Sequence, residues 1–187
     1  EHLAISRATP NTWVFRPADL VETAESWELA LSAKETPSVL SLTRQGVPAV
    51  RTSHTGRNLT AQGAYVLAKP EGKRQAILIA TGSEVGLAMD AAEALAAEGK
   101  QVRVVSMPET GLFDQQDAEY REAVLPSAVT ARVAVEALQA DFWYKYVGLN
   151  GAIVGMTTFG ESAPAGELFK HFGFTVENVV EKVKSVI

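Results

Sequence analysis

Short apolar runs alternate with helical patterns from residue 64 to the end of the chain, and this alternation constrains the fold more than any other feature. Its clearest unit is the stretch AILIATGSEVGLAMDAAEALAAEGKQVRVVSMP, Ala76 to Pro108. That stretch predicts a strand, a glycine turn, a helix and a second strand. Strands that alternate with helices predict an α/β fold, with a mostly parallel sheet covered by helices on both faces.

The other elements of this part follow from the same patterns. The further predicted strands are Ala64–Ala68, Ala131–Val135 and Ala152–Met156. One helix is expected to be capped by Asp114 and to run to Leu125, one to begin near Pro164, and the last to have Thr175 as its N-cap. Gly99 lies where a glycine commonly ends a helix. An aromatic cluster is interpreted as core or subunit interface; its members are Phe142, Trp143, Tyr144 and Tyr146.

Residues 1–47 are interpreted as part of a second α/β domain. The segment NTWVFRP predicts a short strand, and Asp19 with Glu22 resembles a capping box at a helix start. Apolar residues then follow at helical spacing, namely Leu20, Ala24, Trp27 and Leu31. A short buried strand is expected at Ser38–Thr43. Residues 48–62 are polar and without a clear period, which favours a linker, so residues 63–187 form the second predicted domain.

Composition excludes several classes of function. The chain has no cysteine, which excludes disulfides, thiolate zinc sites and a cysteine nucleophile. The formal net charge is −5, and the basic residues are scattered, so no nucleic-acid partner and no membrane partner are expected. His2, His54 and His171 lie far apart and are interpreted as surface residues. The N-terminal segment lacks the charged and apolar regions of a signal peptide.

The glycine turn ATGSEVG raises the question of a bound nucleotide or diphosphate. A dinucleotide fingerprint has G-x-G-x-x-G at such a turn, but here Gly82 stands alone and Gly86 follows four residues later. Glu84 places a negative charge where a phosphate would bind, and it suits the helix dipole by itself. The pattern favours a structural corner of the sheet over a ligand site.

Longer motifs carry a family resemblance. The segments ATGSEV, RVVSMPETGLFDQQDAEYREAVLP and TARVAVEALQADFWYKYVGLNGAIVGMTTFGESAPAGELFKHFGFTVENVV are similar to the C-terminal domain of transketolase. RATPNTWVFRPAD and LTRQG resemble the end of that enzyme's pyrimidine-binding domain. The resemblance covers essentially the whole chain.

The resemblance implies a parent enzyme that moves a two-carbon ketol unit from a ketose phosphate to an aldose phosphate in the pentose phosphate pathway. It also implies thiamine diphosphate with Mg or Ca as cofactors, a homodimer, and a cytoplasmic location. The family's diphosphate domain, its metal ligands and its cofactor-activating glutamate have no counterpart here. We therefore expect no cofactor in this fragment and no activity from it alone, and we assign it no catalytic, cofactor-binding or metal-ligating residue.

One functional position carries over from the resemblance. Arg44 in LTRQG matches the family arginine that binds the phosphate of the sugar substrate. It follows a predicted strand, at the end where α/β sheets bind ligands. A guanidinium recognises phosphate in a planar, bidentate way. By spacing alone, a solvated surface arginine is the alternative.

Two other functions remain open at this stage. The parent can be a relative of dihydroxyacetone synthase, which uses another acceptor. The chain can also be a stand-alone binding or assembly module of a split enzyme.

Overall fold

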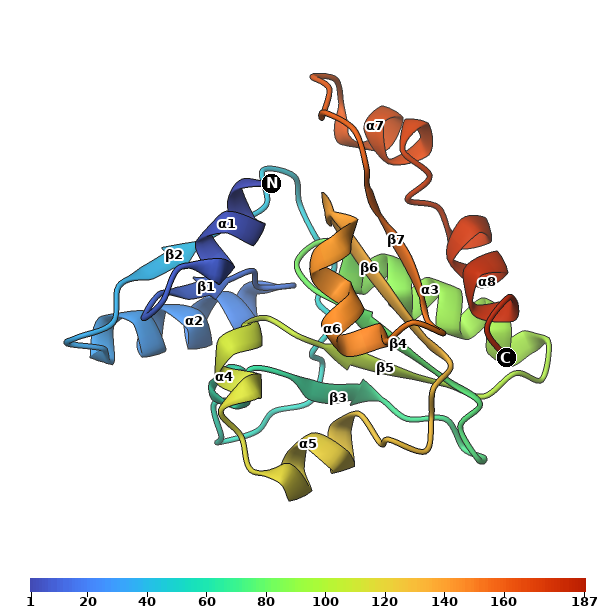
Figure 1. The fold of residues 1–187 in the computed structure, drawn as a ribbon, viewed down its shortest axis with the longest axis horizontal. Coiled ribbons are helices and arrows are strands. Elements are labelled where there is room, and N and C mark those ends of the chain that lie inside the picture. The colour runs from blue at the N-terminus through green and yellow to red at the C-terminus, as the bar shows by residue number, and fades with distance from the viewer.

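The computed structural model describes residues 1–187 as two adjoining parts (Figure 1). Residues 1–47 hold two helices and a small sheet, which lie together beside the main sheet. Their elements are α1 (His2–Ala8), β1 (Trp13–Phe15), α2 (Leu20–Ser32) and β2 (Ser38–Leu40). β1 and β2 pair in parallel over three residues each, from Trp13 opposite Ser38 to Phe15 opposite Leu40. β2 is therefore shorter than the predicted strand Ser38–Thr43.

The second part is built on a five-stranded sheet with the order β3-β5-β4-β6-β7. Its strands are β3 (Tyr65–Ala68), β4 (Ala76–Ala80), β5 (Val102–Ser106), β6 (Arg132–Gln139) and β7 (Ala152–Met156). Four of them run parallel, and β3 pairs antiparallel with β5 at one edge. Its helices and 3₁₀ turns are η1 (Thr60–Gln62), α3 (Glu84–Ala97), α4 (Thr110–Asp114), α5 (Ala118–Val124), η2 (Ala140–Trp143), α6 (Tyr144–Val147), α7 (Ala165–His171) and α8 (Val176–Lys184).

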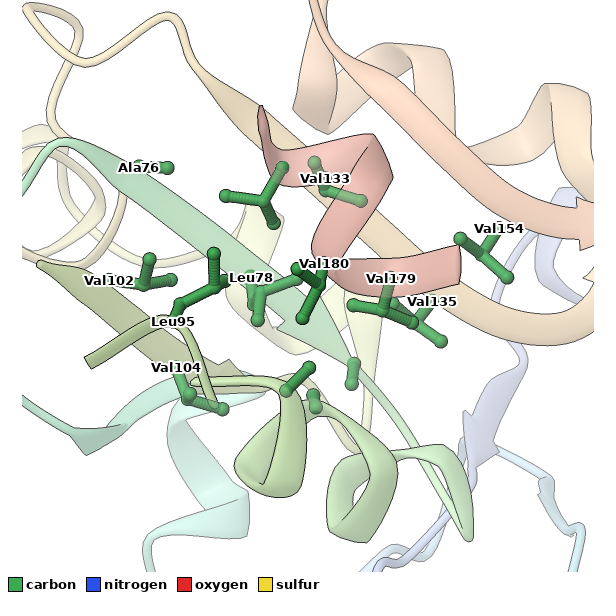
Figure 2. Packing of buried hydrophobic residues seen from close by; sticks show 14 of the residues in the cluster. Ala76, Leu78, Leu95, Val102, Val104, Val133, Val135, Val154, Val179 and Val180 are labelled. Carbon is green, nitrogen blue, oxygen red and sulfur yellow. The ribbon is translucent and has the colours of Figure 1, made fainter. Parts of the chain in front are cut away.

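Apolar side chains cover both faces of this sheet. On one face α3 and α8 pack over Leu78, Val104 and Val133. Figure 2 shows these three strand residues together with Val179 and Val180 of α8. On the other face Ile77 and Ile79 pack with residues of α4, α5 and α6, among them Phe113 and Tyr146. Each fully buried Leu, Ile or Val contributes roughly 1.5–3 kcal/mol to folding. The predicted α/β fold, a mostly parallel sheet covered on both faces, is confirmed.

Local signals placed several helix ends correctly. Thr175 caps α8 by accepting a hydrogen bond from Asn178 N, and Gly99 follows α3 with a positive φ of 74°. The expected helix from Asp114 to Leu125 is wrong. Glu109 caps α4, which ends at Asp114, and Asp117 caps the separate helix α5. Two acidic caps eight residues apart produce two short helices in place of one.

The orientation of α2 is the reverse of what its apolar spacing indicates. Asp19 caps this helix as expected, with its carboxylate accepting from Glu22 N at 3.0 Å. However, the residues at helical spacing, Leu20, Ala24, Trp27 and Leu31, are all exposed, whereas Glu22 and Ser26 are fully buried. The helix therefore turns a polar face toward the main sheet and leaves its apolar face uncovered.

The aromatic cluster is divided between core and surface. Trp143 and Tyr146 are buried and Phe142 is half-buried, but Tyr144 is exposed. No helix of the chain has both the length and the apolar character that crossing a membrane requires.

Candidate functional site

The carboxyl ends of β4 and β6 mark the point at which the strand order reverses. From β4 the chain passes through α3 to β5 on one side, and it later returns to β6 on the other side. In open α/β sheets the crevice at such a point is where ligands bind. Here its walls are the turn Thr81–Gly82, the start of α3 at Glu84, and Glu136 on β6.

The side chain of Arg16, from the N-terminal part, fills this crevice. Its guanidinium pairs with the carboxylate of Glu84, and its Nη1 lies 3.3 Å from both Thr81 O and Glu136 Oε1. Its backbone is also tied to the turn, because Gly82 N and Thr81 Oγ1 donate to Arg16 O at 2.9 and 3.0 Å. A segment that is 65 positions away in sequence thus closes the glycine turn.

Gly82 is required at this turn for two reasons. Its φ is +60°, a backbone conformation that costs L-residues with a side chain about 1–2 kcal/mol. A Cβ atom would also stand 2.9 Å from Arg16 Cγ and Nε. The glycine therefore makes room for the arginine side chain and not for a phosphate.

Glu136 is fully buried and holds two arginines. Arg7 Nη1 and Nη2 each donate to its carboxylate at 2.8 Å, in the bidentate arrangement that guanidinium and carboxylate favour. Trp143 Nε1 donates to it at 2.8 Å, and Arg16 approaches from the other side. Burial alone would raise the pKa of Glu136, but the neighbouring Arg7 and Arg16 outweigh burial and hold it below its ordinary value. The carboxylate is thus ionised and fully paired.

These four charged side chains, Arg7, Arg16, Glu84 and Glu136, form a neutral buried network (hereafter the arginine–glutamate network). A diphosphate would bring negative charge next to two carboxylates and would have to displace Arg16. The residues at the glycine turn therefore do not fit the diphosphate of a cofactor. Nowhere in the chain do three or more His, Asp or Glu side chains gather in a way that could hold a metal ion.

Arg44 lies in a second cleft directly beside the network. The cleft has a volume of about 280 Å³ and lies between the loop after β2, the start of α3 and helix α7. Its polar lining comes from Ser41, Thr43, Arg44, Gln45 and Ser83, with Arg16 and Glu84 at the base. The resemblance and the strand-end argument both place Arg44 near a ligand site, and the structure puts it in a cleft shared by the two parts of the chain.

Ion pairs between its lining residues determine the net charge of this cleft. Arg16, Arg44 and Glu84 are its charged lining residues. Arg16 pairs with Glu84, whereas Arg44 is exposed and belongs to none of the ion pairs of the chain. The one uncompensated charge in the cleft is therefore the guanidinium of Arg44, which suits an anionic group.

A separate polar contact joins α2 to the edge of the main sheet. Glu22 is fully buried, and its Oε1 accepts from Tyr65 Oη at 2.7 Å and from Ser106 Oγ at 2.5 Å. Burial raises the pKa of Glu22, and hydrogen bonds from Ser106, Tyr65 and Ala18 N offset this only in part. Nearby, Glu25 pairs with Arg51 at 2.6 Å. These contacts explain why α2 buries its polar face.

Sequence reasoning missed Arg7, Arg16 and Glu136. For Arg16 and Glu136 the available signal was a charged residue within or directly after an apolar run, as in WVFRP and ARVAVEAL, because such charges are rarely buried unless paired. The pairing itself was invisible, since Arg16 and Glu136 are 120 positions apart. The three histidines are exposed.

Family models of two transketolase domains match most of the chain. Residues 1–49 match the family model described as the transketolase pyrimidine-binding domain, and residues 63–175 match the transketolase-like C-terminal domain. Transketolase 2 of Vibrio parahaemolyticus serotype O3:K6 is 58% identical over 187 residues, which are 100% of this chain and 28% of that protein. The chain therefore spans 28% of the length of this curated relative.

Solved structures show the same fold. A transketolase of Pichia stipitis in complex with sedoheptulose-7-phosphate superposes with a TM-score of 0.89 at 40% identity, over 98% of this chain and 26% of that one. A split-gene transketolase described as an inactive β4 tetramer superposes with a TM-score of 0.79 at 30% identity, over 98% of this chain and 60% of that one.

Proposed function

Because this chain belongs to the transketolase family, we propose that it is the C-terminal part of a transketolase and that Arg44 binds the phosphate of its sugar substrates. The observation that carries the proposal is the cleft in which Arg44 is the uncompensated charge. The proposed reaction is the transfer of a two-carbon ketol unit from a ketose phosphate to an aldose phosphate. The match to the pyrimidine-binding domain points to thiamine diphosphate, which supplies the carbanion chemistry when bound.

Arg44 has a positioning task in this reaction. A guanidinium can donate two parallel hydrogen bonds to a phosphate and so fix the far end of an extended sugar. Ser41, on the same loop, offers a hydroxyl group to one of the remaining oxygens, whereas the hydroxyl of Thr43 donates to Gln45 O and shapes the loop. A substrate that is held at its phosphate presents its carbonyl end in a restricted range of orientations, which lowers the entropy cost of the reaction.

Two uncovered surfaces support the proposal that this chain works as part of a larger enzyme. Leu20 and Leu31 on α2 are 82% and 77% exposed, and Trp27 between them is 47% exposed. Parallel sheets are normally covered on both faces, yet Val39, the central residue of β2, is also exposed. Exposed apolar patches of this kind mark interaction surfaces. We expect the preceding part of the pyrimidine-binding domain to cover them, and the chain alone to be inactive.

The split-gene match favours a second arrangement, in which a separate chain supplies the rest of the enzyme. The same uncovered face of α2 would then bind that partner chain. Mixing the separately purified chains tests this arrangement. Recovery of ketol transfer supports it, and a lack of activity from well-folded chains contradicts it.

The Arg44→Ala variant of the complete enzyme tests the proposed phosphate anchor. A charged hydrogen bond of this type contributes about 1.5–3 kcal/mol, so we expect KM for phosphorylated sugars to rise by roughly ten- to hundred-fold. KM for unphosphorylated acceptors should change far less. Arg57→Ala is the matched control, because it removes another exposed arginine that does not line the cleft. Equal losses on both substrate classes would remove the anchor role.

A further inference from the structure

We propose that Arg16 is a positioning residue that determines specificity for phosphorylated substrates. By pairing with Glu84 it cancels the one negative charge in the lining of the Arg44 cleft. This inference rests on the proposed function of Arg44 and extends it to a residue that acts through Glu84. It also assigns a task to the C-terminal sheet, whose glycine turn and α3 provide the binding site for Arg16.

The first step of the argument is electrostatic. Glu84 and Arg44 line the same cleft, and a phosphate bound to Arg44 would therefore approach a carboxylate. An unpaired carboxylate at that place would repel the phosphate. The guanidinium of Arg16 pairs directly with that carboxylate, and the two side chains are 10% and 1% exposed. With Arg16 in place, the cleft presents Arg44 alone to an anion.

The second step is mechanical. Arg16 follows Phe15, the last residue of β1, and Phe15 O accepts a hydrogen bond from Ser41 N at 2.8 Å. Ser41 begins the loop that carries Arg44. Arg16 is in turn held by Gly82 N, and its own N donates to Pro108 O at 2.9 Å. The contacts of Arg16 with the C-terminal sheet thus set the position of the strand end from which the Arg44 loop starts.

The first step fixes the sign of the expected effect. Removal of the Arg16 charge leaves Glu84 unpaired beside the phosphate, whereas the backbone hydrogen bonds of Arg16 remain and keep the end of β1 in place. The lost pairing weakens the binding of phosphorylated substrates and does not act on an acceptor that carries no phosphate. A role limited to stability would instead lower the active fraction of the enzyme and would leave the ratio of the two KM values unchanged.

The test uses the complete enzyme with phosphorylated and unphosphorylated acceptors. For Arg16→Gln we expect KM for the phosphorylated acceptor to rise by about ten-fold or more relative to the unphosphorylated one, because like charges then face each other. The double variant Arg16→Gln with Glu84→Gln should recover most of that loss. Arg16→Lys, which keeps the charge, should stay within about two-fold of wild type, since its ammonium still neutralises Glu84.

Arg51→Gln is the matched control. Arg51 is also a buried arginine, its side chain 5% exposed, and it pairs with Glu25, but it does not line the Arg44 cleft. Its KM ratio should equal that of wild type. A KM ratio that is unchanged in Arg16→Gln overturns the inference, and so does a double variant that recovers nothing.

The two proposals fail in different ways. If Arg44→Ala shows no selective effect, the phosphate anchor itself is wrong. If Arg44→Ala is selective and Arg16→Gln is not, the anchor stands and only the role of Arg16 is wrong.

Discussion

The Cγ and Nε atoms of Arg16 lie 2.9 Å from the point that a Cβ atom on Gly82 would occupy. This proximity answers the question that the glycine turn raises. The turn has the position of a ligand crevice, and an arginine of the same chain occupies it. The residue that suits a phosphate site by its charge, Arg44, lies in the adjoining cleft.

Gly82→Ala should destabilise the chain by about 2 kcal/mol or more, because it combines left-handed strain with a close contact to Arg16. Urea unfolding of the 187-residue chain measures this change. Gly99→Ala is the control, since Gly99 has a φ of +74° but nothing within 4 Å of its added Cβ. It should show only the backbone cost, about 1–2 kcal/mol. Equal losses in the two variants would contradict the packing of Arg16 against the turn.

Glu22→Gln should change how stability depends on pH. Burial raises the pKa of Glu22 above the ordinary 4.5, so the folded state keeps a proton that the unfolded state releases. The contribution of Glu22 is therefore fully present below pH 4.5 and is lost as pH rises through the raised pKa. A glutamine does not titrate, so the stability of the variant relative to wild type should increase with pH across this window.

Thermal unfolding of both proteins at a series of pH values from 4.5 upward measures the difference. The other carboxylates with shifted pKa values, Glu25, Glu109 and Glu136, are present in both proteins and largely cancel in the comparison. Parallel pH profiles would show that Glu22 is not protonated in the folded chain.

Leu31→Lys should leave the stability of the 187-residue chain nearly unchanged, because this side chain is 77% exposed. Exposed substitutions away from special features usually change stability by less than about 0.5 kcal/mol. Urea unfolding of the 187-residue chain measures this change. In the complete enzyme the same variant should be strongly destabilising, since we expect that face to be covered there. A large loss of stability in the short chain would mean that α2 already buries this face.

Sequence patterns predicted the main sheet well, because each strand and helix carries its own local signal. Thr175 and Gly99 act within one helical turn of their own positions, so their roles are visible in a short window. The prediction that Asp114 caps a helix was wrong because Glu109 and Asp117, on either side of it, are the capping residues. Periodicity over α2 identified a helix correctly.

The same periodicity could not say what the apolar face of α2 packs against. Glu22 reaches hydroxyl groups on β3 and β5, and these distant partners decide which face turns inward. The candidate site was predictable only in part for a similar reason. Arg44 could be identified by motif, but the network that neutralises its surroundings depends on contacts between residues about a hundred positions apart, as with Arg16 and Glu136.

The bidentate contact between Arg7 and Glu136 spans 129 positions of the chain. During synthesis Arg7 is added long before Glu136. At about 5–20 residues per second, the interval between the two additions is roughly 6 to 26 seconds. During that time Arg7 lacks the carboxylate that later holds it. The ion pair that holds α1 against the main sheet can therefore form only after β6 has been made.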